Sequence, residues 1–317
     1  MKMQKQITST LLMIRPVQFR FNEQTAVNNY YQKKIGSLNA EEIQKKAQME
    51  FDGFAEVLRE HGIDVIVVDD TAIPDTPDSI FPNNWISFHE DGRVAVYPMY
   101  AENRRLERRE DILEILRDNY AFSWAEKVDF TFYESEGKYL EGTGSMILDR
   151  VNKIAYAALS QRTNEEALQE FCTRFDYKPV LFKAYQDVDG DRLPIYHTNV
   201  MMCVADEFAI LCADSIDDRQ ERKTVIDMLL ATGKEVIYIS EEQKEYFAGN
   251  MLQVSNAANE RFLVMSSAAY DSLGERQIAD IQKHCPIVHS PLHTIEALGG
   301  GSARCMMAEI FLPKKKQ

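Results

Sequence analysis

Hydrophobic positions along the chain follow two alternating spacings. In five segments, apolar residues recur every three or four positions, which predicts amphipathic helices. These helices are expected at residues 39–58, 108–119, 164–175, 218–232 and 272–284. A short run rich in β-branched and aromatic residues, typical of a strand, follows each one. The runs are IDVIVVDD, VDFTFYE, KPVLFKAY, KEVIYIS and CPIVHSPL. The pattern predicts an α/β chain in which a helix-then-strand unit occurs five times.

Polar loops follow the five predicted strands. Their sequences are FPNNW, LEGTGS, YHTNV, AGNML and GGGSARC. Each of the first four leads into a hairpin-like stretch, for example VMMCVADEFAILC, where polar turn residues separate two apolar runs. After the last loop only CMMAEIFL remains, so we expect the amino-terminal run STLLMIRP to pair with this final strand and close a ring without an open edge.

One polar residue marks each loop, and the intervals between the markers are 57, 56, 53 and 55 residues. The markers are Asn84, Glu141, His197, Asn250 and Cys305. Such a period is typical of solenoids and propellers, and in a closed ring of five the loops would meet in one pocket at the axis. An unrelated α/β chain with evenly spaced connections is the alternative. We expect a single domain over residues 1–317, built from five ββαβ-type repeats with pseudo-fivefold symmetry.

Composition narrows the classes of partner. The formal net charge of −14 disfavours nucleic acid and anionic membranes, and favours a small polar substrate. No apolar segment approaches membrane-spanning length, so we expect a cytoplasmic protein.

The five cysteines lack a C-x-x-C pair, which predicts free thiols. The spacing of His284, Cys285, His289 and His293 fits no standard zinc site, so we expect no metal and no cofactor.

Three residue types suggest covalent chemistry. Cys305 ends a glycine-rich stretch, where a ligand can approach the backbone closely and the adjacent Arg304 favours a nucleophilic thiolate. His197 could transfer protons, and Glu141 could hold a substrate nitrogen or tune His197. Taken singly, each has a structural alternative: a core cysteine, a structural histidine or a turn glutamate. Their equivalent places in the repeats strengthen the catalytic interpretation.

The cysteine after a glycine-rich stretch, the YHTN motif and the EGTG motif resemble those of the guanidine-modifying (pentein) superfamily. It includes arginine deiminases, dimethylarginine hydrolases, amidinotransferases and succinylarginine dihydrolases. Segments such as FPNNWISFHEDGRVAVYPM, LEGTGSMILDR and GGGSARCMMAEIFLP most closely resemble the bacterial citrulline-utilising hydrolases of the CtlX group, over nearly the whole chain. The resemblance implies a five-bladed α/β propeller. It also implies that Cys305 is the nucleophile, His197 the general acid and base, and Glu141 the carboxylate that binds the substrate nitrogens.

Two departures from arginine deiminases bear on the substrate. Those enzymes place aspartates at two positions where this chain has Asn84, in the loop that begins at Phe81, and Asn199. A ureido group is neutral and offers an acceptor oxygen, whereas a buried guanidinium without carboxylate partners costs several kcal/mol as an order of magnitude. The sequence therefore predicts hydrolysis of citrulline, or a close analogue, to ornithine, CO2 and NH3.

Several alternatives stay open. Succinylarginine dihydrolases resemble the asparagine pattern while accepting a guanidinium, so an arginine or methylarginine deiminase, a dihydrolase or an amidinotransferase remains an enzymatic alternative. A non-catalytic pentein binding module is an alternative of another class. The possible partners are a small amino-acid substrate and further copies of the chain.

Other residues are candidates for supporting roles. Arg15, Arg162 and Arg304 are candidates for the substrate carboxylate, since arginine binds carboxylates through two parallel hydrogen bonds. Phe81 and Asn250 are candidate pocket residues, and the polar loop 187–191 is a candidate lid. The charges of the segment NRRLERR interleave with glutamates and predict a solvated helix start.

Overall fold

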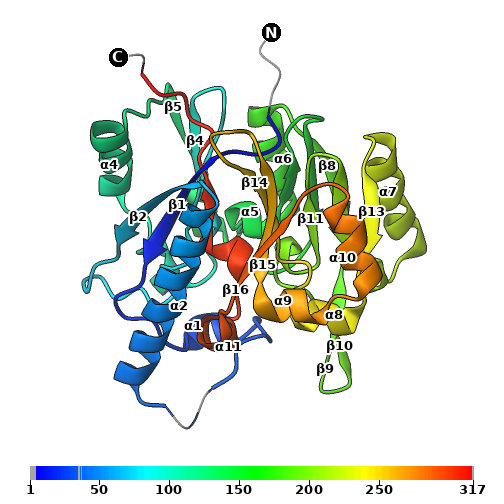
Figure 1. Ribbon diagram of the computed structural model, residues 1–317, viewed down its shortest axis with the longest axis horizontal. Helices are drawn as coiled ribbons and strands as arrows, with labels where there is room; N and C mark the ends of the chain where they lie inside the picture. Colours follow the sequence, from blue (N-terminus) through cyan, green and yellow to red (C-terminus); the bar gives the residue numbers. More distant parts are fainter. Residues whose placement is uncertain (1–4, 35, 37, 316–317) are drawn as a thin grey trace.

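The computed structural model describes residues 5–34, 36 and 38–315. Within them, five three-stranded sheets repeat along the chain (Figure 1). Their strand orders are β17-β1-β2, β3-β4-β5, β6-β7-β8, β11-β12-β13 and β14-β15-β16, and β9-β10 is a separate hairpin. The strands are β1 Thr10–Arg15, β2 Asp64–Asp69, β3 Ile86–Phe88, β4 Arg93–Val96, β5 Glu126–Asp129, β6 Ile147–Asp149, β7 Ile154–Ala158, β8 Lys178–Phe182, β9 Tyr185–Val188, β10 Asp191–Pro194, β11 Met202–Val204, β12 Phe208–Leu211, β13 Glu235–Tyr238, β14 Leu252–Ser255, β15 Arg261–Ser266, β16 Ile287–Ser290 and β17 Ala308–Glu309.

In every three-stranded sheet the central strand pairs antiparallel with one neighbour and parallel with the other. A helix precedes each parallel strand, which confirms the predicted repeating unit. The α-helices are α1 Glu23–Ala26, α2 Ala40–Glu60, α3 Glu102–Arg105, α4 Glu110–Tyr120, α5 Gly142–Ser145, α6 Glu165–Phe175, α7 Arg219–Ala231, α8 Glu241–Glu245, α9 Ser267–Ser272, α10 Glu275–Gln282 and α11 His293–Gly299. The 3-10 turns are η1 Pro82–Asn84, η2 Thr131–Glu136, η3 Thr198–Val200, η4 Ala213–Ser215 and η5 Ala303–Met306.

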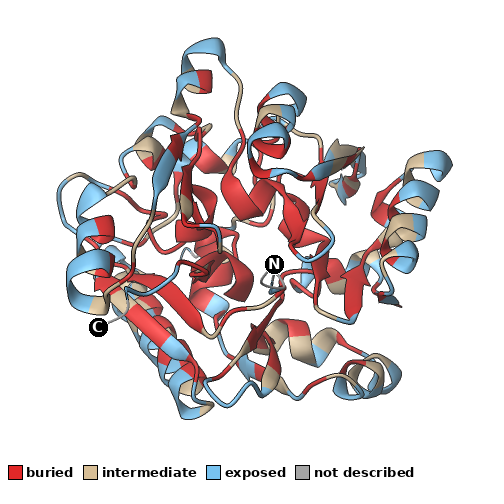
Figure 2. Ribbon diagram, turned by 90° about the horizontal axis from the view of Figure 1, so that it is seen from above, coloured by how far each residue is buried: buried red, intermediate tan, exposed pale blue. Residues whose placement is uncertain are grey.

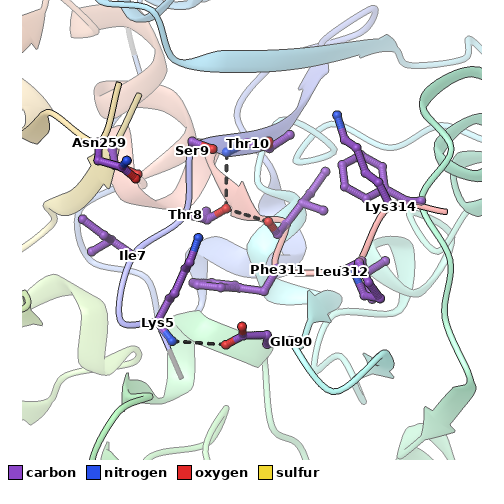
Figure 3. Close-up of a pocket in the computed structure, with 14 residues that line it drawn as sticks. Lys5, Ile7, Thr8, Ser9, Thr10, Glu90, Asn259, Phe311, Leu312 and Lys314 are labelled. Atoms are coloured by element: carbon purple, nitrogen blue, oxygen red, sulfur yellow. Dashed lines mark hydrogen bonds between the residues drawn. The ribbon is translucent and has the colours of Figure 1, made fainter. Parts of the chain in front are cut away.

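The first sheet joins the two ends of the chain. Strand β1 pairs antiparallel with β17, in the register Leu11 with Glu309 and Leu12 with Ala308. This confirms the predicted pairing of the amino-terminal run with the final strand. A surface pocket lies beside this junction, where the Thr8 hydroxyl donates a hydrogen bond to the Ile310 carbonyl at 2.6 Å (Figure 3).

Local signals set the main helices. Asn39 caps α2, accepting a hydrogen bond from the Glu42 backbone while the Glu42 carboxylate accepts one from the Asn39 backbone. The helix then buries one apolar face, including Phe51, Phe54 and Leu58. The other predicted helices lie within about three residues of α4, α6, α7 and α10.

Two predicted segments need correction. The run VDFTFYE is a strand only as far as Asp129, whose carboxylate accepts a hydrogen bond from the Thr131 backbone and starts the turn η2. The polar segment 187–191, expected as a loop, lies at the tip of the hairpin β9-β10: its ends belong to the two strands, and Asp189 and Gly190, both with positive φ, form the turn.

The sheets surround a common centre. Buried segments gather there and exposed segments lie at the rim (Figure 2). Strand β3 contacts β17, and β11 contacts both β6 and β14. The loops that lead into these strands therefore approach one another. No helix in the described part of the chain is long and apolar enough to cross a membrane.

Candidate active site

The five marker residues are all buried, and each stands just before a strand at the centre of the molecule. Four of them belong to, or directly precede, the short turns η1, α5, η3 and η5, while Asn250 lies in the loop before β14. Asn84, His197 and Cys305 line one small cavity, and Glu141 and Asn250 are hydrogen-bonded to its walls. The cavity is lined by Asn29, Asp78, Phe81, Asn84, Arg104, Arg162, Tyr196, His197, Gly299, Gly300, Gly301 and Cys305.

Two side-chain amides contact the Cys305 sulfur. The Nδ2 atoms of Asn199 and Asn250 each donate to Sγ at 3.3 Å. Asn250 is held in turn, because its Oδ1 accepts from the Arg304 backbone N–H at 3.0 Å and its Nδ2 also donates to the Asn199 carbonyl. Such donors can stabilise negative charge on the sulfur.

His197 and Glu141 form a buried pair, with Nε2 of His197 2.7 Å from Oε2 of Glu141. Burial lowers the pKa of His197 to about 4, although Glu141 opposes this effect. Burial alone would raise the pKa of Glu141, but the Arg162 guanidinium and the hydrogen bond to His197 hold it well below its usual value. Glu141 is therefore ionised and accepts the Nε2 proton, which leaves Nδ1 of a neutral His197 as a base.

Asn84 and Asn199 leave polar atoms unused. Oδ1 of Asn84 accepts a hydrogen bond from Nη1 of Arg104 at 2.8 Å, whereas its Nδ2 has no partner among the described residues. In Asn199 the oxygen is the unpaired atom. Its Nδ2 donates to Cys305, whereas its buried Oδ1 has no partner among the described residues. One donor and one acceptor are thus available to a ligand.

Arg104 and Asp78 also line the cavity, although the sequence pattern did not single them out. The predicted solvated helix start is wrong for Arg104 and Glu107, which are both buried and paired through two hydrogen bonds of 2.8 and 2.9 Å. Burial raises the pKa of Asp78, and its Oδ1 has no partner in the described structure.

Of the three candidate arginines for the substrate carboxylate, only Arg162 lines the cavity. Arg15 lies at the surface and pairs with Asp52 through hydrogen bonds of 2.7 and 2.8 Å. Arg304 turns away from the cavity and donates to the Met307 carbonyl and the Glu309 carboxylate, each at 2.8 Å. The proposed contact of Arg15 and Arg304 with substrate is therefore corrected, because both guanidinium groups point elsewhere.

Glycines allow the walls of the cavity to approach one another. A Cβ at Gly301 would lie 2.9 Å from the Phe81 ring, so Phe81 packs directly on the glycine-rich loop. Phe81, a candidate pocket residue, also lines the cavity. A Cβ at Gly144 would overlap the Asn84 amide nitrogen and lie 2.8 Å from Nδ1 of His197. These glycines are needed for close approach rather than for flexibility.

The cavity is covered by the segment that contains α1. Asn29 donates to the carbonyls of Gly299 and Gly300, both at 3.3 Å, and the Asn28 carboxamide accepts from Nε of Arg162 at 2.9 Å. The candidate lid 187–191 does not line the cavity. Among the described residues, no group of three or more histidine, cysteine or acidic side chains could hold a metal ion.

A protein-family model described as N,N dimethylarginine dimethylhydrolase, eukaryotic, matches residues 15–312. The chain belongs to this family. The dimethylarginine dimethylhydrolase family is part of the pentein superfamily of guanidino-group hydrolases, in agreement with the resemblance of the sequence motifs. No curated protein sequence matched the chain.

Solved structures share the fold of this dimethylarginine dimethylhydrolase family member. Apo ArgZ, an arginine dihydrolase from the ornithine-ammonia cycle in Cyanobacteria, superposes with a TM-score of 0.72 at 17% identity, over 96% of this chain and 41% of ArgZ. An AgrE cysteine variant with L-arginine gives 0.71 at 17% identity, over 97% and 41% of the two chains. A dimethylarginine dimethylaminohydrolase adduct with S-methyl-L-thiocitrulline gives 0.62 at 12% identity, over 96% and 100%. The chain thus spans about two fifths of ArgZ and AgrE.

Proposed function

We propose that the protein is a cysteine-dependent hydrolase of the ureido group of citrulline or a close analogue. The observation that carries this proposal is the polarity of the two unpaired amide atoms. A ureido oxygen can accept from Nδ2 of Asn84, and a ureido N–H can donate to Oδ1 of Asn199. A guanidinium carries only donors, so it would place its N–H groups against the NH2 group of Asn84 and leave a buried donor without an acceptor.

The first half of the reaction is attack of the Cys305 sulfur on the ureido carbon. Nδ1 of His197 takes the thiol proton, and Glu141 stabilises the imidazolium that forms. One of the two carbon–nitrogen bonds at the ureido carbon then breaks. The departing nitrogen takes that proton from His197 and leaves as a neutral amine or ammonia, while the other nitrogen stays on the carbon. A thiocarbamate on Cys305 remains.

The second half releases the enzyme. His197, neutral again, takes a proton from water, and the water oxygen bonds to the thiocarbamate carbon. The carbon–sulfur bond breaks and the sulfur regains a proton from His197. The carbamate that leaves loses CO2, so the overall products are ornithine, CO2 and NH3. The chain's own residues supply every proton transfer.

The remaining charges of the cavity suit the other end of an amino acid. The unpaired Oδ1 of Asp78 can accept from an ammonium group, and Nη1 of Arg162, which donates one N–H to Glu141, has a second N–H that a carboxylate oxygen can accept. Both lie in the cavity that holds Cys305. This arrangement supports a free amino acid as substrate.

The architecture in this proposal is a single domain over residues 1–317, in which the five sheets close into a five-bladed propeller. The pairing of β1 with β17 and the contacts of β3 with β17 and of β11 with β6 and β14 support closure. Closure would bring all five marker loops to one axis. The ends of this range, residues 1–4 and 316–317, lie outside the described residues.

A second candidate is a hydrolase of arginine or a substituted arginine. The AgrE variant that shares this fold is in complex with L-arginine. In this chain the carboxylate of Asp78 lines the cavity, and the carboxylate of Glu141 lies behind His197, to which it is hydrogen-bonded. An arginine dihydrolase would also release ornithine, but from a cationic substrate.

The test is amino-acid analysis after incubation of the purified protein with citrulline, arginine, methylated arginines and succinylarginine, each in parallel with Cys305→Ser. Ornithine from citrulline, absent with the variant, is the expected result. Products from arginine alone would favour the second candidate, and no turnover of any compound would favour a non-catalytic binding module.

A further inference from the structure

Arg104 connects a buried carboxylate to one of the two asparagines. Its Nε and Nη2 donate to Oε1 and Oε2 of Glu107 at 2.8 and 2.9 Å, and its Nη1 donates to Oδ1 of Asn84 at 2.8 Å. All three side chains are almost fully shielded from solvent. The guanidinium is therefore fixed by a two-point ion pair on one edge and presents an N–H to Asn84 on another.

This contact decides which way the Asn84 amide faces. Arginine offers only donors, so a flipped carboxamide would bring its NH2 group against the Arg104 N–H in a buried site. With Oδ1 taken, Nδ2 is left without a partner among the described residues. It lies beside the imidazole, because a Cβ at Gly144 would meet both Nδ2 of Asn84 and Nδ1 of His197.

We propose that Glu107 is a positioning residue which, through Arg104, holds the NH2 group of Asn84 toward the substrate and so selects a neutral group with an acceptor oxygen over a guanidinium. The inference rests on the proposed function of the cavity and assigns the origin of its substrate preference. Glu107 itself does not line the cavity, so it acts only through Arg104.

The test measures binding without turnover, in the Cys305→Ser background, by calorimetry with citrulline and with arginine. Glu107→Gln keeps the size of the side chain but removes the charge that fixes the Arg104 guanidinium. The preference for citrulline over arginine, taken as the ratio of the two dissociation constants, is expected to fall by about tenfold. If Glu107→Gln does not fold, Glu107→Asp, with its shorter reach, replaces it with the same expectation.

A double-mutant cycle separates positioning from a general structural role. In Asn84→Asp, one carboxylate oxygen can accept from Arg104 while the other faces the cavity, so arginine should be preferred and Glu107→Gln should no longer change the ratio. The matched control is Asp149→Asn, which removes a buried carboxylate 3.6 Å from Lys234 and away from the cavity. It should lower the melting temperature and leave the ratio unchanged.

The outcomes distinguish the inference from the proposed function. An unchanged ratio in Glu107→Gln, or an equal change with asparagine and with aspartate at position 84, would overturn the role of Glu107 even if the active protein hydrolyses citrulline. Absence of citrulline hydrolysis by the protein with Cys305 intact would instead contradict the proposed function.

Discussion

In the proposed mechanism Glu141 acts through its hydrogen bond to His197 rather than on the substrate nitrogens, because its Oε1 accepts from the Tyr100 backbone N–H and its Oε2 contacts His197 and Arg162. The ionised carboxylate accepts the Nε2 proton and so keeps Nδ1 available as the base. Glu141→Gln removes this charge, and the amide can present an N–H to the imidazole instead of an acceptor. We expect kcat/KM for citrulline to fall by about a hundredfold or more, measured by ornithine release. Unchanged kinetics would show that His197 does not depend on this carboxylate.

The buried carboxyl group of Glu296 allows a test of how burial changes the pKa of an acidic residue in this protein. It accepts a hydrogen bond from the Ser302 hydroxyl at 2.6 Å, and burial raises its pKa from 4.5 to about 7. Between these values the folded state binds more protons than the unfolded state, so this group makes stability decline as pH rises.

Glu296→Gln keeps an acceptor for Ser302 but cannot titrate. Relative to the variant, the wild-type protein should lose about 3 kcal/mol of unfolding free energy between pH 4.5 and about 7, as measured by urea denaturation. Stability curves that run parallel across this pH range would contradict the raised pKa.

The sequence located the residues of the site better than it located their partners. Spacing brought out the five marker residues, because equivalent loops of a repeat occupy equivalent places. It could not separate Arg104 and Glu107 from a solvated helix turn, because alternating charges look the same in both settings. Nor could residue type show which way an arginine points, and Arg304 turns away from the cavity although it precedes Cys305.

The short helix α5 brings the Asn84 loop and the His197 loop together at Gly144. Gly144→Ala would place a methyl group against Nδ2 of Asn84 and Nδ1 of His197. We expect activity to fall by about a hundredfold or more, since misplacement by about 1 Å costs that much. The measurement is kcat/KM together with the melting temperature.

Gly53 is the matched control for this substitution. It is exposed within α2, and a Cβ there would meet nothing within 4 Å. Gly53→Ala should leave activity unchanged and stabilise the protein by about 1 kcal/mol, because alanine has the higher helix propensity. Equal activity of the Gly144 and Gly53 variants would show that close approach at Gly144 is not required.

At the element scale, predictions succeeded where one periodicity dominates. The apolar spacing and cap of α2 identify it from sequence alone. The run VDFTFYE failed because aromatic residues suit a strand and a 3-10 turn alike, and the Asp129 side chain ends the strand by a local hydrogen bond. The short turns that carry the marker residues, before β3, β6, β11 and β17, have too few residues to show any period.

Gln6 links separate sheets of the whole molecule. Its Nε2 donates to the carbonyls of Leu148 in β6 and Val204 in β11, and its Oε1 accepts from the Arg150 backbone N–H. Gln6→Ala would remove all three bonds from a buried position. We expect a loss of about 2 kcal/mol or more of unfolding free energy, measured in urea, whereas the exposed Gln169→Ala should change little. Equal effects would exclude a bridging role.

The repeat explains why the global arrangement could be anticipated. An incomplete last unit needs a strand from elsewhere, and the apolar run at the amino terminus could supply it; β1 indeed pairs with β17. The covering segment with α1 had no counterpart in the other repeats, so periodicity carried no information about it. The contacts of Asn28 and Asn29 with the cavity therefore emerged only from the structure.

The proposed mechanism requires a covalent thiocarbamate between Cys305 and the ureido substrate. It is tested most directly by rapid acid quenching of the protein with citrulline labelled with heavy carbon at the ureido position, followed by mass spectrometry of the peptide that contains Cys305. We predict label on Cys305 during turnover and label in the CO2 released. Ornithine formation without label on this cysteine, under conditions in which the adduct survives quenching, would exclude covalent catalysis by Cys305.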